Sequence, residues 1–99
     1  MNINNKNTVI AFDVDGTLIT YDDKPRYSVI ATYNYFLSLG CTMVIWSGGG
    51  QEYAERWASK LGLYADHIAC KFGTHSFGKP DIAFDDEIES QLGKVNIYV

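Results

Sequence analysis

The chain has 99 residues, of which 46% are hydrophobic, and its formal net charge is −4. This length supports one hydrophobic core and leaves no room for another, so we expect residues 1–99 to form a single domain. The negative charge disfavours nucleic-acid binding driven by overall charge, and the lack of a long apolar stretch disfavours a membrane span. We also expect no signal peptide.

The first predicted element is a buried strand over residues 9–12 that ends in two acids. Four consecutive apolar residues between polar ones are typical of a strand covered on both faces of a parallel sheet. Asp13 and Asp15 follow it, one residue apart, and are themselves followed by Gly16 and Thr17. Side chains alternate along an extended chain, so both carboxylates should point the same way. This places paired acids at the carboxyl end of a strand, where open α/β sheets bind ligands.

A contribution to fold stability does not explain Asp13 and Asp15, because adjacent carboxylates repel each other and are costly to bury unpaired. One carboxylate can instead attack a phosphorus centre while its neighbour moves a proton, with a divalent cation offsetting the charge. The alternative to a catalytic role is that Asp13 and Asp15 lie in a solvated acidic loop after the strand.

A glycine-rich turn closes the next predicted unit. A polar connector over residues 18–27 leads into a helix over residues 28–39, with Ser28 as the expected N-cap. A second buried strand, residues 42–46, runs directly into Ser47, Gly48, Gly49 and a third glycine. A hydroxyl and several glycine amides at a strand's carboxyl end form a pocket for phosphate oxygens, although such turns also occur for steric reasons alone.

The rest of the chain supplies a second pair of acids. The remaining predicted elements are a helix over residues 51–61, strands over 67–70, 81–84 and 95–99, and a short helix over 87–92. Asp85 and Asp86 directly follow the 81–84 strand. In a parallel sheet the carboxyl ends of the strands share one edge, so this pair should lie near Asp13.

The residues that follow three of the predicted strands resemble the motifs of the haloacid dehalogenase (HAD) superfamily of phosphohydrolases. Residues 13–17, D-x-D-G-T, are similar to the first motif, Ser47 to the second, and Asp85-Asp86 to the fourth. The resemblance implies a three-layer α/β/α, Rossmann-like domain with a parallel sheet of about five strands. The connector over residues 18–27 is too short for a cap domain, so we expect an open site.

The resemblance also implies a role for each matched residue. Asp13 is the expected nucleophile and Asp15 the general acid/base, while Ser47, Gly48 and Gly49 hold phosphate. Mg²⁺ prefers hard oxygen ligands and keeps several waters. Asp13, Asp85 and the backbone carbonyl of Asp15 would bind it, with support from Asp86 directly or through water.

Two lysines compete for the role of balancing negative charge, which the family also assigns to a lysine. Lys79 precedes Pro80, as in the family's signature, but it lies six residues before Asp85. An extended stretch of that length spans about 20 Å, which would put Lys79 at the opposite end of the sheet. Lys71 follows the 67–70 strand directly and is favoured on reach. Lys79 remains the alternative if the chain doubles back.

We therefore expect a cytoplasmic, magnesium-dependent phosphomonoesterase that acts on a small phosphorylated substrate. The two cysteines, Cys41 and Cys70, are too far apart along neighbouring strands for a disulfide, which favours a reducing compartment. One alternative is a metal-dependent binding or regulatory module without activity. Another is a phosphatase for nucleic-acid ends, with a local basic rim of Lys24, Arg26 and Lys71. The oligomeric state is left open.

Overall fold

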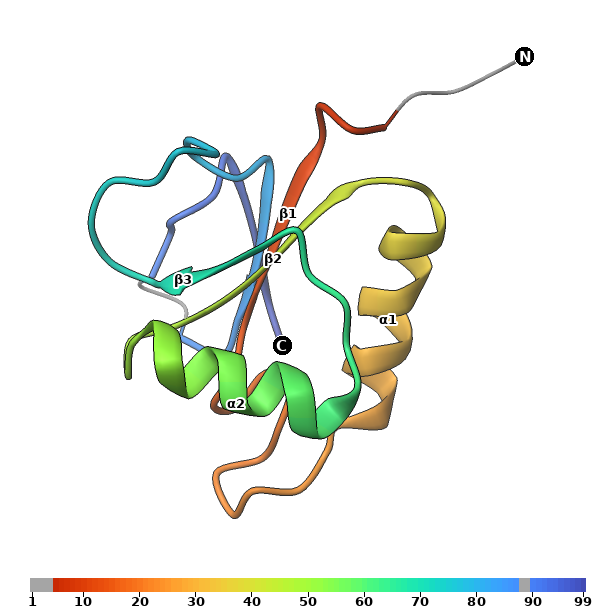
Figure 1. The fold of residues 1–99 in the computed structure, drawn as a ribbon, viewed down its shortest axis with the longest axis vertical. Coiled ribbons are helices and arrows are strands. Elements are labelled where there is room, and N and C mark those ends of the chain that lie inside the picture. Colours follow the sequence, from red (N-terminus) through yellow and green to blue (C-terminus); the bar gives the residue numbers. More distant parts are fainter. Residues whose placement is uncertain (1–4, 88–89) are drawn as a thin grey trace.

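A parallel β-sheet forms the centre of the molecule (Figure 1). The computed structural model describes residues 5–87 and 90–99. Within them the strands are β1 (Val9–Asp13), β2 (Thr42–Ser47), β3 (His67–Cys70), β4 (Ile82–Asp85) and β5 (Val95–Tyr98). Their order is β3-β2-β1-β4-β5 and every neighbouring pair is parallel, so β1 is central. This confirms the α/β, Rossmann-like class with a five-stranded sheet and no cap.

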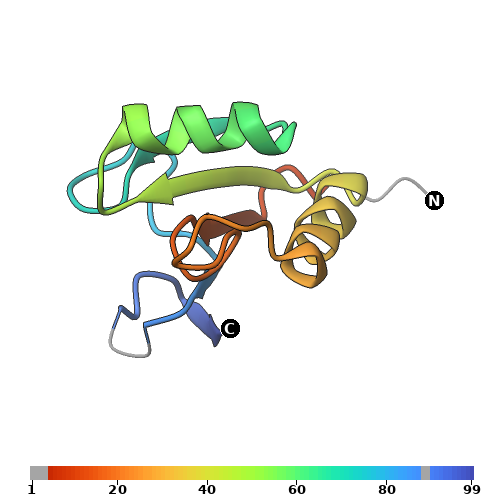
Figure 2. The ribbon, with the colours of Figure 1, turned by 90° about the horizontal axis from the view of Figure 1, so that it is seen from below.

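Both helices cover the same face of the sheet. Residues of α1 (Tyr27–Ser38) and of α2 (Gln51–Leu61) belong to one hydrophobic cluster with side chains of β1, β2 and β4. The reason is topological: the connections from β1 to β2 and from β2 to β3 step in the same direction, and right-handed crossovers then place both helices on one side. Figures 1 and 2 show α1 on one side of the strands and the segment 71–80 on the other.

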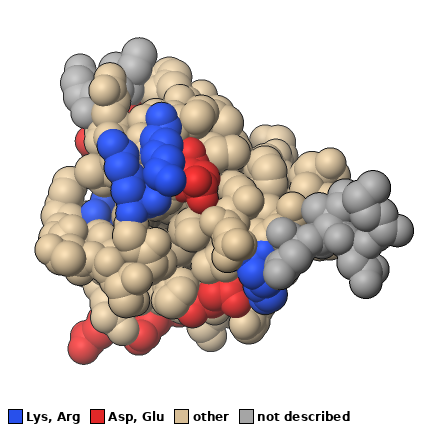
Figure 3. Space-filling view, turned by 90° about the horizontal axis from the view of Figure 1, so that it is seen from above, with Lys and Arg blue, Asp and Glu red and all other residues tan. Residues whose placement is uncertain are grey.

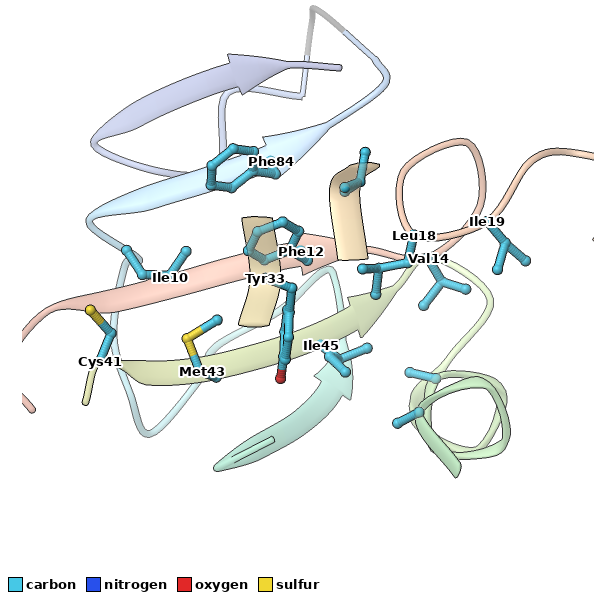
Figure 4. Packing of buried hydrophobic residues seen from close by; sticks show 13 residues of the cluster. Ile10, Phe12, Val14, Leu18, Ile19, Tyr33, Cys41, Met43, Ile45 and Phe84 are labelled. Carbon is cyan, nitrogen blue, oxygen red and sulfur yellow. The ribbon is translucent and has the colours of Figure 1, made fainter. Parts of the chain in front are cut away.

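The core on the helix-covered face is built on stacked aromatic rings (Figure 4). Phe12 of β1 is fully buried and stacks on Phe84 of β4, with ring centroids 4.3 Å apart. Tyr33 of α1 meets the edge of Phe12 at 5.1 Å. These contacts hold the central strand β1 against both β4 and α1, and so help to position its carboxyl end.

The opposite face is covered by irregular chain instead of a helix. Its core is smaller and consists of Ala11, Val44, Trp46 and Ala83, against which Phe77 of the 71–80 segment packs. Within the described residues, the third layer of the expected three-layer arrangement is thus a loop. The segment is short and contains two glycines and a proline, which explains why it forms no helix.

The predicted strands and the two longer helices agree with the structure to within one residue at each end. The prediction for Ser28 was wrong, because α1 begins at Tyr27 and its N-cap, Arg26, makes no side-chain capping bond. Residues 88 and 89 of the predicted short helix lie outside the described part; Glu87 and residues 90–92 are not helical. Cys41 and Cys70 are free thiols. In the described chain, no helix has the length and apolar character needed to cross a membrane.

Replacing Phe12 with alanine should reduce the free energy of unfolding by about 3–5 kcal/mol, because it opens a cavity among Phe84 and Tyr33. The measurement is equilibrium urea denaturation. The control Tyr27→Ala removes a ring that is 76% exposed and should change stability by at most about 0.5 kcal/mol. Equal effects of the two substitutions would contradict this account of the core.

Candidate active site

Four strands bring polar residues to the same edge of the sheet. Asp13, Ser47 and Asp85 are the last residues of β1, β2 and β4, and Lys71 directly follows β3. The pairing of β1 with β4 places Asp13 level with Asp85, and the pairing of β2 with β3 places Ser47 next to the turn that carries Lys71. All four residues are buried. Their position follows from the parallel sheet, whose carboxyl ends share one edge.

Three carboxylates and one ammonium group form the centre of this edge. Oxygens of Asp13, Asp85 and Asp86 lie within 4.8 Å of one another. The Lys71 Nζ is 2.6 Å from Asp85 Oδ2 and 3.8 Å from Asp13 Oδ1. The Lys71 side chain, 5% exposed, therefore offsets only part of the negative charge gathered there.

This arrangement shifts the proton affinities of its members. The pKa of the Asp13 carboxyl is raised to about 8, chiefly by burial and next by the negative charge of Asp85, while Lys71 acts in the opposite direction. Burial lowers the pKa of Lys71, but its hydrogen bond to Asp85 and the charge of Asp13 outweigh this and raise it above the usual value. The cluster thus has a deficit of positive charge.

The second lysine candidate lies away from this cluster. Lys79 is exposed and precedes the start of β4, whereas the carboxylates follow the strand's end. None of the ion pairs among the described residues involves Lys79. Lys79 thus lies before β4 and the carboxylates at or after its end, so the structure brings Lys71, and not Lys79, to Asp13 and Asp85.

Asp15 lies beside the cluster and has a different partner. Its carboxyl group is half-buried and is not one of the three grouped carboxylates. The hydroxyl of Tyr53, in the first turn of α2, donates a hydrogen bond of 2.6 Å to Asp15 Oδ1. The sequence analysis did not assign Tyr53 to the site. Its place just after the glycine-rich turn was the available signal that its hydroxyl could reach the site.

The glycine-rich turn forms one wall of a pocket over these acids. Ser47 Oγ accepts a hydrogen bond of 3.0 Å from the Gly49 N–H, while Gly48 and Gly49 are exposed. The pocket has a volume of about 210 Å³. It is lined by Asp13, Asp15, Tyr21, Ser47, Gly48, Gly49, Lys71, Phe72 and Glu87. The structure thus brings the predicted phosphate-binding turn and the first acid pair into one space.

A short loop between β1 and α1, called the flap below, closes one side of the pocket. The hydroxyl of Tyr21, in the loop after β1, donates a hydrogen bond to Asp86 Oδ2, a contact that sequence reasoning did not find. Gly16 makes this close approach possible: its φ is +77°, and a Cβ there would lie 2.3 Å from the same Asp86 oxygen. Arg26 anchors the end of the flap by donating to the backbone carbonyls of Gly16 and Val99.

The residues present fit a divalent cation. Hard oxygen donors from Asp13, Asp85 and Asp86 converge within the reach of one ion, and a cation there would offset the negative charge of Asp85, which together with burial raises the pKa of Asp13. The carboxylate of Asp15 is not part of this donor set, so any contribution from Asp15 would come from its backbone carbonyl, as the sequence led us to expect.

Comparison with known proteins agrees with this geometry. A family profile described as haloacid dehalogenase-like hydrolase matches residues 10–94, which include all three junctions at the sheet edge. Neither the comparison with curated proteins nor that with solved structures gives a match. The family match extends over most of the chain, and we conclude that this protein belongs to the haloacid dehalogenase-like hydrolases.

Proposed function

We propose that the protein is a magnesium-dependent phosphomonoesterase that works through an aspartyl-phosphate on Asp13. The observation that carries the proposal is the convergence of Asp13, Asp85 and Asp86 at the sheet edge. Lys71 pairs with the first two of them, and both Asp13 and Lys71 line the same pocket as Asp15. A carboxylate nucleophile with a second acid beside it suits transfer of a phosphoryl group to the protein and then to water.

Each residue has a distinct part in the proposed reaction. Asp13 attacks phosphorus, and the bond to the leaving oxygen breaks as Asp15 donates its proton to that oxygen. In the second step Asp15 takes a proton from water, which attacks the phosphorus and releases phosphate and Asp13. Tyr53 holds Asp15 through its 2.6 Å hydrogen bond and so keeps the carboxyl group oriented for both transfers.

The phosphate itself would be held from two sides. Ser47, Gly48 and Gly49 line the pocket at the end of β2, and Lys71 lines it just after the end of β3. When bound, Mg²⁺ would be held by Asp13, Asp85 and Asp86 and would neutralise charge on the phosphoryl oxygens.

The alternatives receive less support. A basic rim for nucleic-acid ends is disfavoured because Lys24 pairs with Asp22, Arg26 bonds backbone carbonyls and Lys71 is buried against Asp85. A binding module without activity has no need of Asp15 and its partner Tyr53. We propose a small phosphorylated substrate and, from the free thiols, a cytoplasmic location.

Asp13→Asn should lower kcat by about 10³-fold or more, because an amide cannot act as the nucleophile. The measurement is phosphate release from a generic aryl phosphate, with circular dichroism to check folding. Asp23→Asn is the matched control: Asp23 is exposed in the flap at a φ of 64°, which asparagine tolerates. Full activity of Asp13→Asn would exclude the nucleophile assignment.

Removal of divalent cations should abolish turnover, and added Mg²⁺ should restore it. Independently of activity, Mg²⁺ at ten times its Kd should stabilise the fold by roughly 1.4 kcal/mol, seen as a rise in Tm. Asp85→Asn should lose most of this rise because it removes one ligand of the cluster. If added Mg²⁺ left the Tm of the native protein unchanged, the proposed metal site would be contradicted.

Lys71→Met should lower kcat by about 10²- to 10³-fold, since it removes the ammonium group 2.6 Å from Asp85 and 3.8 Å from Asp13. The assay is run with saturating Mg²⁺, and thermal unfolding confirms a folded variant. Lys94→Met, a lysine paired with Asp81 at 3.3 Å outside the site, is the control. If Lys79→Met lost as much activity as Lys71→Met, the charge-balancing role would pass to Lys79.

A further inference from the structure

Two exposed aromatic rings line the pocket of the candidate active site. Tyr21 is 73% exposed and Phe72 is 62% exposed, and both belong to the lining of the pocket that contains Asp13. The rest of the described lining consists of three acids, one serine, one lysine and two glycines. The two rings are therefore the apolar surface of this pocket, and the proposed reaction assigns no role to either of them.

The two rings approach Asp13 from different sides. In the strand order β3-β2-β1-β4-β5, Asp13 ends the central strand β1. Phe72 follows β3 on one side of β1, and its ring lies against Gly48, which follows β2. Tyr21 belongs to the flap and donates its hydrogen bond to Asp86, which follows β4 on the other side of β1. A group attached to a phosphate over Asp13 would therefore have one ring on each side of it.

Contacts within the protein hold both rings at the pocket. A Cβ at Gly48 would lie 3.3 Å from a carbon of the Phe72 ring, and a Cβ at Gly16 would lie 2.9 Å from a carbon of the Tyr21 ring. Glycine at these two positions thus makes room for the rings. The Lys71 Nζ lies 5.8 Å from the centroid of the Phe72 ring, within the range of cation–π attraction. Because the rings are positioned before a ligand arrives, less conformational entropy is lost when it binds.

The pocket suits an uncharged, planar group next to the phosphate. Aromatic side chains attract a flat ring through stacked or edge-to-face contacts, which a saturated ring of similar size cannot make. The lysine of the lining, Lys71, is already paired with Asp85, and the exposed acid Glu87 disfavours a negatively charged group. The volume of about 210 Å³ is smaller than the roughly 300–1,000 Å³ of typical ligand pockets, so it admits the phosphate and the group beside it.

The amino end of the sheet has a different surface. Over the amino end of β1, basic and acidic side chains lie next to one another (Figure 3). There Lys94 is 3.3 Å from Asp81, which offsets its charge. The exposed rings at the carboxyl end have another physical consequence, because a ligand that covers apolar surface removes it from water and is stabilised by doing so.

We propose that Tyr21 and Phe72 hold an aromatic ring of the substrate between them, and that the protein acts on phosphate monoesters of alcohols with an aromatic ring close to the ester oxygen. The phosphate lies over Asp13, and the rest of the substrate extends past the two rings toward solvent. The position of the phosphate rests on the proposed function, whereas the aromatic contacts rest on the pocket itself.

Benzylphosphonate and cyclohexylmethylphosphonate, which have a P–C bond in place of the ester, test the rings separately from catalysis. Calorimetric titration in the presence of Mg²⁺ should show that the native protein binds benzylphosphonate more tightly, by about two- to tenfold for each ring contact. Phe72→Leu and Tyr21→Leu keep an apolar side chain but remove the ring, so each should lower this ratio of Kd values by about two- to tenfold.

Two further variants serve as controls for the ratio of Kd values. Tyr21→Phe keeps the ring and should keep the ratio. Tyr27→Leu changes a tyrosine that is 76% exposed and is not among the residues that line the pocket, and it should also leave the ratio unchanged. The hydrogen bond from Tyr21 to Asp86 is lost in Tyr21→Leu for both phosphonates alike, so the ratio reports the ring alone. Thermal unfolding verifies that each variant is folded.

Turnover is compared between benzyl phosphate and cyclohexylmethyl phosphate, whose alcohols are similar in acidity. Phe72→Leu should lower the ratio of the two kcat/KM values, benzyl over cyclohexylmethyl, by the same factor as the ratio of Kd values. Equal Kd values in the native protein, absence of binding, or a preference that survives both leucine substitutions overturns the inference even if the protein hydrolyses both esters. A preference lost in both leucine variants, without turnover of any phosphate ester, supports the aromatic contacts and rejects the proposed function instead.

Discussion

The repulsion among Asp13, Asp85 and Asp86 is the constraint around which this protein is built. Three carboxylates lie within 4.8 Å of one another at a largely buried edge, and among the described residues Lys71 is the one cation paired with any of them. Such a group destabilises the fold unless cations balance it. In the proposed reaction a divalent cation would supply the balancing charge at the place where negative charge develops.

The sheet keeps these groups together despite their repulsion. The rings of Phe12 and Phe84 stack one residue before Asp13 and Asp85, so the packing that stabilises β1 against β4 also holds the two acids level. The apolar contacts are distributed along both strands, whereas the repulsion is confined to their ends. The hydrophobic effect on one face of the sheet thus stabilises an arrangement that electrostatics alone would separate.

Because the chain is short, few elements surround the candidate site. The flap after β1 carries Tyr21, which bonds Asp86, and the anchor Arg26, and within the described residues nothing of domain size covers the acids. The helices α1 and α2 both cover one face of the sheet, and the 71–80 loop covers the other. A pocket of about 490 Å³ opens beside Lys71 and Phe72 on this loop-covered face.

The sequence by itself determined the strands and the edge of the sheet that holds the candidate site. Buried runs followed by Asp13, Ser47 and Asp85 locate strand ends, and parallel strands bring those ends together, so local pattern and topology suffice. Other features depended on contacts between residues distant in sequence. The path of the 71–80 loop decided that Lys71 reaches the acids and Lys79 does not, and tertiary packing brought Tyr53 to Asp15. Hydrogen bonds of this kind leave no periodic trace in the sequence, because they are set by how whole elements pack.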